Sequence, residues 1–236
     1  MGYIAIKSSL LQAIRIPSLF NYFYSLRDLE RLLGISFQNL WKYVNLVSVP
    51  MRSTIDKILK RVEGLKLMDR ILSEIVNHFD NVAALTGNPG FLKLFSILVA
   101  KIVGSTKVDT VILLSLEAIP LAMVVTLETN STVRHVYSHD VRIATHENYM
   151  VSHYVSQTHE LRFIAIPKSC LKPRSKVVLV ETVIEDLNKI ATIIDLLKKR
   201  MCVPTLLIAI DSVENAYSIA QRYKLHVKVL REAVNN

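Results

Sequence analysis

Apolar residues recur at three- and four-residue spacing through the first third of the chain, as in a helix with one buried face. Leu26, Leu29 and Leu33 show this spacing, with Ser25 as an expected N-cap and Gly34 as the expected residue just past the helix end. The pattern predicts helices over 8–16, 25–34, 37–46, 51–64, 65–76 and 91–103. The segment TGNPG before the last of these is typical of a turn.

After Gly104 the pattern changes to an alternation of strands and helices. Strands are predicted over 108–116, 131–139, 159–167, 176–182, 204–212 and 225–230, and helices over 119–129, 185–201 and 214–224. Near-continuous runs of valine, isoleucine and leucine favour a mainly parallel sheet that helices cover. We therefore predict an α/β fold, with a helical domain over 1–78 and an α/β domain over 79–236.

Hydrophobic residues make up 51% of the 236, which suffices for one large domain or two small ones. The longest apolar run, 111–127, contains Glu117 and Pro120 and is too broken to cross a bilayer. The opening residues lack a secretory pattern, so we expect a cytoplasmic protein with no membrane partner. The two cysteines, Cys170 and Cys202, have no metal-binding spacing and are expected to be buried thiols.

Charge and glycine content change the picture in different ways. The net charge is +9, and residues 1–75 hold 11 lysines and arginines against 6 acidic residues. Such an excess attracts polyanions, although an ordinary solvated surface has the same composition. The last of the six glycines is Gly104. Any later site that needs positive φ, or bare amides against a phosphate, therefore lacks its usual residue.

The segment 26–45, LRDLERLLGISFQNLWKYVN, resembles the DNA-binding helix-turn-helix. Leu29 and Leu33 lie on one face of the first helix, Gly34 permits the turn, and Leu40 and Tyr43 supply the apolar face of the second. Glu30 departs from the pattern, because a small residue there usually lets the helices pack closely.

The resemblance makes 37–44 a recognition helix. Its amides could pair with adenine, its lysine could reach guanine or a phosphate, and the next helix start could contact the DNA backbone. The predicted nucleic-acid-binding residues are Ser36, Phe37, Gln38, Asn39, Lys42, Arg52, Ser53 and Lys57. The alternative is a helical bundle that mediates dimerisation or packs on the core, with Phe37 and Trp41 in that core.

Two later segments, 107–128 and 176–199, resemble the strand–loop–helix segments of type I phosphoribosyltransferases. Ile119, Pro120, Leu121 and Ala122 match the family's PLA-containing helix, and residues 115–118 occupy its pyrophosphate loop. The resemblance covers about residues 80–236. It implies a sheet of phosphoribosyltransferase type behind the helix-turn-helix domain.

The second segment differs from the family's sequence at the positions with which the family binds the phosphoribosyl group. Glu181 and Thr182 take the positions of the acidic pair that holds the ribose, Glu185 and Asp186 replace threonines, and Leu187 replaces a glycine. A like charge at about 4 Å costs roughly 4 kcal/mol at an effective dielectric of about 20. We expect the two carboxylates to cap the following helix instead of admitting a phosphate. We thus predict no catalytic residues, no cofactor and no enzyme activity.

Five of the seven histidines fall within a short segment and raise the question of a zinc site. They are His135, His139, His146, His153 and His159. The segment reads as strand and loop, in which residues i and i+4 lie about 13 Å apart. We therefore expect no metal site.

The order of a helix-turn-helix followed by a phosphoribosyltransferase-like domain resembles purine-type transcription regulators of bacteria and archaea. The resemblance implies a homodimer that binds double-stranded DNA, with the second domain serving dimerisation or altered ligand sensing. One alternative is a non-enzymatic interaction protein that binds RNA, the ribosome or another protein. A second alternative is a phosphoribosyltransferase.

Overall fold

The computed structural model describes residues 14–79, 81–104, 106–138, 147–155, 158–213 and 216–231. The chain divides into two compact units, Met1–Ser105 and Thr106–Asn236. The division falls 27 residues or so after the boundary predicted from the sequence, 78/79, because residues 79–104 group with the helices that precede them. Each unit is described by itself.

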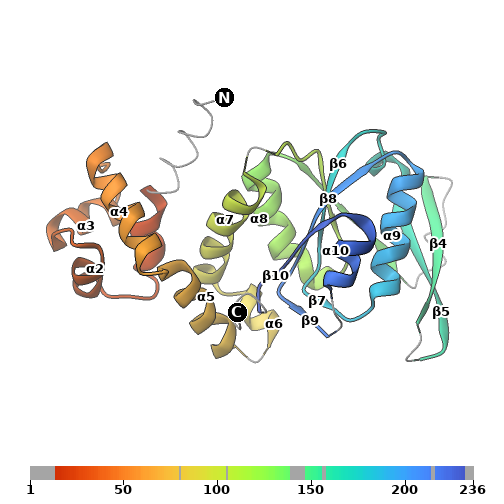
Figure 1. Cartoon of the computed structure of the whole chain (residues 1–236), viewed down its shortest axis with the longest axis horizontal. Helices are drawn as coiled ribbons and strands as arrows, with labels where there is room; N and C mark the ends of the chain where they lie inside the picture. The colour runs from red at the N-terminus through yellow and green to blue at the C-terminus, as the bar shows by residue number, and fades with distance from the viewer. Residues whose placement is uncertain are drawn as a thin grey trace. The chain divides into compact units, whose positions relative to one another are not determined.

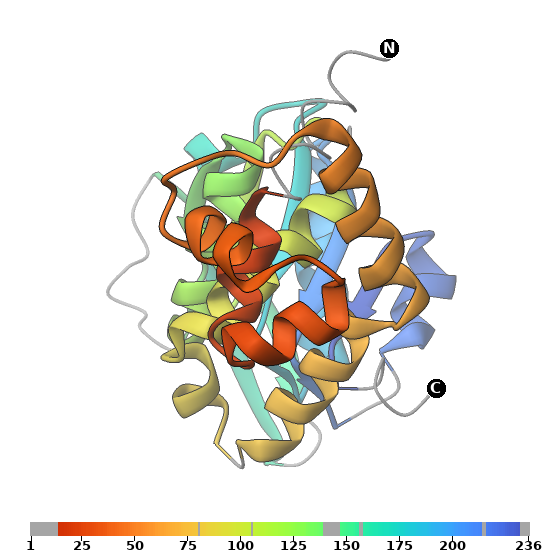
Figure 2. The same ribbon diagram turned by 90° about the vertical axis from the view of Figure 1, so that its left-hand side faces the viewer.

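Every regular element in the described part of the first unit is a helix (Figures 1 and 2). Its helices are α2 (Leu26–Leu33), α3 (Phe37–Val44), α4 (Arg52–Gly64), α5 (Leu67–His78), α6 (Val82–Thr86) and α7 (Pro89–Val103). Five of them confirm predicted helices, whereas α6 was not predicted. Residues 14–20 are also helical, and the rest of the predicted segment 8–16 lies outside the described residues.

The predicted turn 86–90 holds the end of α6 and the start of α7. Asn88 caps α7, accepting a hydrogen bond from Phe91 N at 2.9 Å. A Cβ at position 90 would lie 2.8 Å from Phe23 Cζ, so glycine is what allows the aromatic ring to close against α7. Phe91 and Phe95 stack with ring centroids 6.1 Å apart, and both are fully buried in the core.

The second unit is built on a five-stranded parallel sheet in the order β10-β8-β6-β1-β2. Its strands are β1 (Thr110–Leu113), β2 (Thr132–His135), β6 (Lys176–Val180), β8 (Val203–Ala209) and β10 (His226–Val229). The crossover helices are α8 (Ile119–Thr129), α9 (Leu187–Lys199) and α10 (Tyr217–Tyr223), and a short 3₁₀ helix (Leu116–Ala118) precedes α8. This arrangement confirms the predicted α/β fold with a mainly parallel sheet.

The strand order reverses between β1 and β6. From β1 the chain passes through α8 to β2 on one side, and from β6 it passes through α9, β8 and α10 to β10 on the other. Open α/β sheets bind ligands beyond the carboxyl ends of the strands at such a reversal. The residues that follow β1 and β6 therefore form the first place to look for a site.

A separate antiparallel sheet has the order β3-β5-β4, and α9 packs on its strand β4 (Figure 1). Its strands are β3 (Tyr137–Ser138), β4 (Asn148–Val155) and β5 (Glu160–Pro167). The strand β4, NYMVSHYV, was not predicted because the outward positions include Met150 and Tyr154 and the buried positions include His153, which weakens the alternation of apolar and polar residues. A small parallel pair joins β7 (Val183–Ile184) to β9 (Asp211–Ser212).

The glycine-free second unit still adopts left-handed backbone. Asn130 ends α8 with φ 51°, Lys224 ends α10 with φ 53°, and Arg174 has φ 65° in the loop before β6. Positive φ is thus supplied by side-chain-bearing residues, at some conformational cost in each case. Among the described helices, none combines the length and the apolar content that a membrane crossing requires.

Candidate functional site

Glu181 lies directly after β6, at the point where the strand order reverses. It is only 5% exposed, which is unusual for a carboxylate. Its Oε1 accepts hydrogen bonds from Ser115 Oγ, which follows β1, and from Thr182 N at 2.9 Å. The side chain that would hold ribose hydroxyls in the resembling family is therefore bonded to the protein itself.

Lys189 completes this network from the first turn of α9. Its Nζ donates to Glu181 Oε2 at 3.1 Å and to the carbonyl oxygen of Leu114 at 2.9 Å. The ion pair is largely buried, with side-chain exposures of 21% for Lys189 and 7% for Glu181. Ser115, Glu181 and Lys189 together join the carboxyl ends of β1 and β6 to the start of α9.

Asp186 is the N-cap of α9, as the sequence predicted. Its Oδ1 accepts from Asn188 N at 2.8 Å and from Lys189 N at 3.2 Å. These two amides are the donors with which a helix start would bind a phosphate. Oδ2 of the same carboxylate lies 3.1 Å from Nε2 of His153, a buried side chain on β4.

The predicted roles of the neighbouring loop residues have different outcomes. Leu187, in the position of the family's glycine, is partly buried and packs against the core. Glu185 is exposed and precedes the N-cap, and the first turn of α9 contains no acidic residue, so the expectation that Glu185 also caps the helix was wrong. Thr182 is 7% exposed, and its carbonyl oxygen accepts from Ile210 N and Asp211 N.

His135 ends β2 beside this network. Burial, followed by the nearby charge of Lys189, lowers the pKa of His135 below its usual value. His153 contacts Asp186, and His159 Nδ1 lies 2.8 Å from Tyr154 Oη. The described part of the chain contains no group of three potential metal ligands, and His139 and His146 lie outside it.

In the first unit, α2 and α3 are joined by a short turn at Gly34. Ser25 caps α2, accepting from Asp28 N at 3.2 Å, and Gly34 ends it with φ 64°, so both predicted helix boundaries are confirmed. Glu30, which departs from the helix-turn-helix pattern, accepts a hydrogen bond from Phe37 N at 3.0 Å. It thus caps α3, whose own N-cap residue Ser36 makes no side-chain cap.

All eight predicted nucleic-acid-binding residues are exposed. They are Ser36, Phe37, Gln38, Asn39, Lys42, Arg52, Ser53 and Lys57. Lys57 also has an internal role, because its Nζ donates to the carbonyl oxygen of Gly34 at 2.5 Å and holds α4 against the turn. The first turn of α4 bears Arg52 and no acidic residue, and no side chain caps it.

The two aromatic residues of α3 are not in the core, contrary to the expectation for Phe37 and Trp41. Phe37 is 41% exposed and Trp41 is 47% exposed, whereas Leu40 and Tyr43 face inward. The segment after α3 adds further exposed apolar side chains, namely Leu46, Val47, Val49 and Met51. The surface around α3 therefore combines amides, cations and apolar groups.

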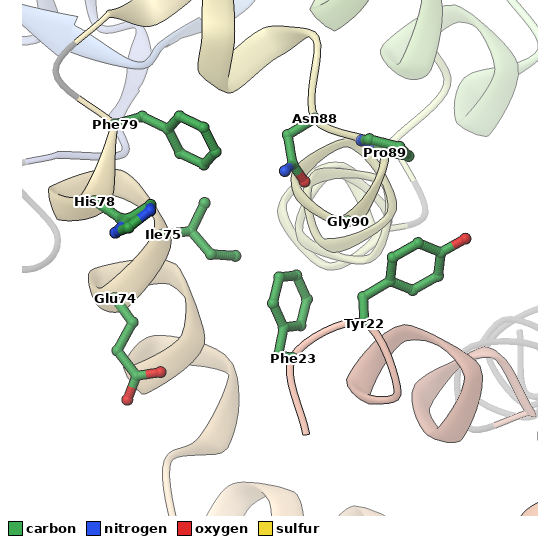
Figure 3. A pocket seen from close by; sticks show the side chains of 9 residues that line it. All are labelled: Tyr22, Phe23, Glu74, Ile75, His78, Phe79, Asn88, Pro89 and Gly90. Carbon is green, nitrogen blue, oxygen red and sulfur yellow. The ribbon is translucent and has the colours of Figure 1, made fainter. Parts of the chain in front are cut away.

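The first unit also has a cavity of about 470 Å³ that the sequence did not indicate. Figure 3 shows Phe23, Ile75 and Phe79 around it, with the amide of Asn88 directed toward it. It is mostly apolar, and Asn88 Oδ1 is already bonded to Phe91 N. No short motif marks this cavity, because its walls come from three separate segments of the chain, the turn after residue 20, α5 and α7.

No protein-family model and no curated protein matches the sequence. Solved structures are similar. Adenine phosphoribosyltransferase from Thermoanaerobacter pseudethanolicus has a TM-score of 0.55 and 10% identity, over 64% of this chain and 86% of that one. The APRTase from Giardia lamblia, complexed with 9-deazaadenine, has a TM-score of 0.55 and 12% identity, over 64% and 84%. Adenine phosphoribosyltransferase from Saccharomyces cerevisiae has a TM-score of 0.50 and 15% identity, over 61% and 81%.

These likenesses show the fold. The chain contains an α/β fold of the type I phosphoribosyltransferase class, as the motifs at 107–128 and 176–199 predicted, and the helical first unit is compatible with it.

Proposed function

We propose that the protein is a DNA-binding transcription regulator whose phosphoribosyltransferase-like domain is catalytically inactive. The observation that supports the loss of activity is the network of Ser115, Glu181 and Lys189. In this network Ser115 and Lys189 donate to the Glu181 carboxylate, and Lys189 also donates to the carbonyl oxygen of Leu114. These groups lie at the strand ends, where this fold would bind a phosphoribosyl group. Asp186 in addition uses the amides of residues 188 and 189.

DNA binding is assigned to α3 and the start of α4. Gln38, Asn39 and Lys42 project from α3 to solvent, and amide side chains can pair bidentately with adenine in the major groove. Arg52 and Ser53 open α4, where a positive helix end and an arginine favour a backbone phosphate. The basic excess of residues 1–75 supports the same assignment.

The test is fluorescence anisotropy of the full chain with labelled genomic duplexes at two salt concentrations. Affinity should fall as salt rises, because phosphate contacts release counterions. The variant Lys42→Gln with Arg52→Gln should weaken binding and lower the salt slope by about 2, since each phosphate contact contributes about 0.9. The control Lys199→Gln with Arg222→Gln removes the same charge from exposed positions of the second unit and should bind as the native protein does.

Binding that is absent, independent of salt, or equal in both variants would remove the proposal. A clear preference for structured RNA over duplex DNA would instead support the RNA-binding alternative.

A second candidate, an interaction protein, is favoured by one observation. Leu46, Val47, Val49 and Met51 are 62–75% exposed in a single connecting segment. Contiguous exposed apolar groups of this kind are typical of protein-binding surfaces. Val47→Ser with Val49→Ser removes exposed apolar surface without adding charge beside Arg52, and should leave DNA affinity within about twofold if the segment serves protein contacts alone.

A further inference from the structure

A second cavity in the phosphoribosyltransferase-like unit lies at the opposite end of the parallel sheet from Glu181. It has a volume of about 400 Å³. Its walls include the starts of β1 and β2, at Thr110 and Thr132, and Ser175, which precedes β6. Because these strands are parallel, their starts share the edge away from the strand ends that carry Ser115 and Glu181. Small-molecule pockets commonly have volumes of roughly 300–1,000 Å³.

The charges around this cavity are predominantly positive. Arg134, Lys172 and Arg174 line it and are exposed. Arg134 Nη1 donates to the neighbouring carbonyl of Val133 at 3.1 Å. Within the described ranges, no acidic side chain lies within ion-pair distance of any of these three cations.

Asp109 is the acidic residue of the lining, and its two oxygens are directed to other partners. Oδ1 lies 3.0 Å from Lys107 Nζ, and Oδ2 accepts from Lys176 N at 2.9 Å. The hydrogen bond from the Lys176 amide, helped by Lys107, lowers the pKa of Asp109. The carboxylate is therefore paired with Lys107 and the Lys176 amide, and the lining holds three cations against this one acidic residue.

Hydrogen bonds of its own backbone and of Ser175 hold the loop that supplies two of the cations. The carbonyl oxygen of Lys172 accepts from Ser175 N at 3.1 Å and from Ser175 Oγ at 2.6 Å. Arg174 has φ 65°, and its N donates to the carbonyl oxygen of Met201 at 2.7 Å. These bonds fix the backbone from within, so a ligand would not have to order the loop before it meets Lys172 and Arg174.

We propose that this cavity is an anion site that binds a phosphate group of a small phosphorylated molecule. Two guanidinium groups can each engage phosphate oxygens bidentately, and Lys172 and the hydroxyl of Ser169 add donors. The location at the strand starts separates it from the strand-end site of the fold. A backbone phosphate of nucleic acid carries the same chemistry, and the experiment below distinguishes the two sources.

The experiment titrates the full chain with pyrophosphate by calorimetry, and with a short DNA duplex by anisotropy. The test variant is Arg134→Gln with Lys172→Gln, and the control is Arg222→Gln with Lys199→Gln, which removes equal charge outside the cavity. Native protein and control should bind pyrophosphate equally, and the test variant should bind it at least about tenfold more weakly. Thermal unfolding of each variant verifies that the exposed substitutions leave the fold intact.

If the ligand is a small molecule, duplex affinity is the same in the test variant and the control. If the phosphate belongs to nucleic acid, the test variant alone loses duplex affinity and pyrophosphate competes with the duplex. Failure of pyrophosphate to bind the native protein, or equal binding by test variant and control, would overturn the proposal.

Discussion

Lys189 Nζ lies 3.1 Å from Glu181 Oε2, and the pair bridges the start of α9 to the end of β6. At this position of an open α/β sheet, a helix start normally offers its amides to an anion. Here the ammonium group of Lys189, from the same helix, is bonded to the carboxylate of Glu181. Asp186 accepts hydrogen bonds from the amides of residues 188 and 189. The local charges are satisfied within the protein, and this network is the basis of the proposed inactivity.

The first prediction concerns this pair. Lys189→Met leaves the buried carboxylate of Glu181 without its cation and should lower the free energy of unfolding by about 3 kcal/mol. The double variant Lys189→Met with Glu181→Gln removes both charges and should be less destabilised than Lys189→Met alone. Urea unfolding of the two single variants and the double variant measures the coupling. Additive effects would show that the two side chains do not interact.

Capping of α9 gives the second prediction. Asp186→Ala removes the acceptor of two amides and should cost about 1–2 kcal/mol of unfolding free energy. Asp186→Asn keeps a capping oxygen and should cost less. Glu185→Ala, one residue earlier and exposed, is the matched control and should stay within about 0.5 kcal/mol of the native protein. A loss in Glu185→Ala equal to that in Asp186→Ala would place the cap elsewhere.

The third prediction is a dependence of stability on pH. Burial and Lys189 lower the pKa of His135 in the folded state, so the unfolded chain binds a proton more readily. The contribution of His135 to stability is therefore complete above about pH 6.5, the usual histidine value, and is lost as pH falls below it. Urea midpoints at about pH 7 and about pH 5 should differ less in His135→Gln than in the native protein. His226→Gln, an exposed substitution on β10, is the control and should keep the native difference.

The fourth prediction concerns assembly. Leu116, Ile119, Met123 and Leu127 are 42–75% exposed and recur at helical spacing through α8 and the turn before it. An apolar stripe of this kind suits a contact between two copies of the chain, in keeping with the homodimer that the sequence resemblance implies. Met123→Glu with Leu127→Glu should shift sedimentation toward the monomer, while Val213→Glu, at another exposed apolar position, should not. A native protein that sediments as a monomer at every concentration would rule out the homodimer.

What the sequence predicted well was local. Ser25, Gly34 and Asp186 were recognised as helix boundaries because a cap acts within three residues of its own helix end. The order of strands and helices after Gly104 followed from runs of apolar residues. Strand β4 was missed because outward Met150 and Tyr154 and buried His153 weaken its alternation of apolar and polar residues.

What the sequence could not predict depends on contacts between distant segments. Ser115 and Glu181 are 66 positions apart, and only the adjacent pairing of β1 and β6 brings them together. Glu30 counted against a helix-turn-helix, yet in the folded chain it caps the second helix. The cavity at the strand starts combines residues from three segments that share no motif.

The most direct test of the central claim is calorimetric titration with phosphoribosyl pyrophosphate and Mg²⁺. The protein titrated is the full chain carrying Arg134→Gln and Lys172→Gln, so that binding at the strand starts is weakened. The account predicts no saturable heat up to about 1 mM ligand. Lys189 is already bonded to the Glu181 carboxylate and to the Leu114 carbonyl oxygen, and Asp186 already accepts from the amide of Asn188 at the start of α9. Saturable one-to-one binding, with release of pyrophosphate when a nucleobase is added, would contradict it.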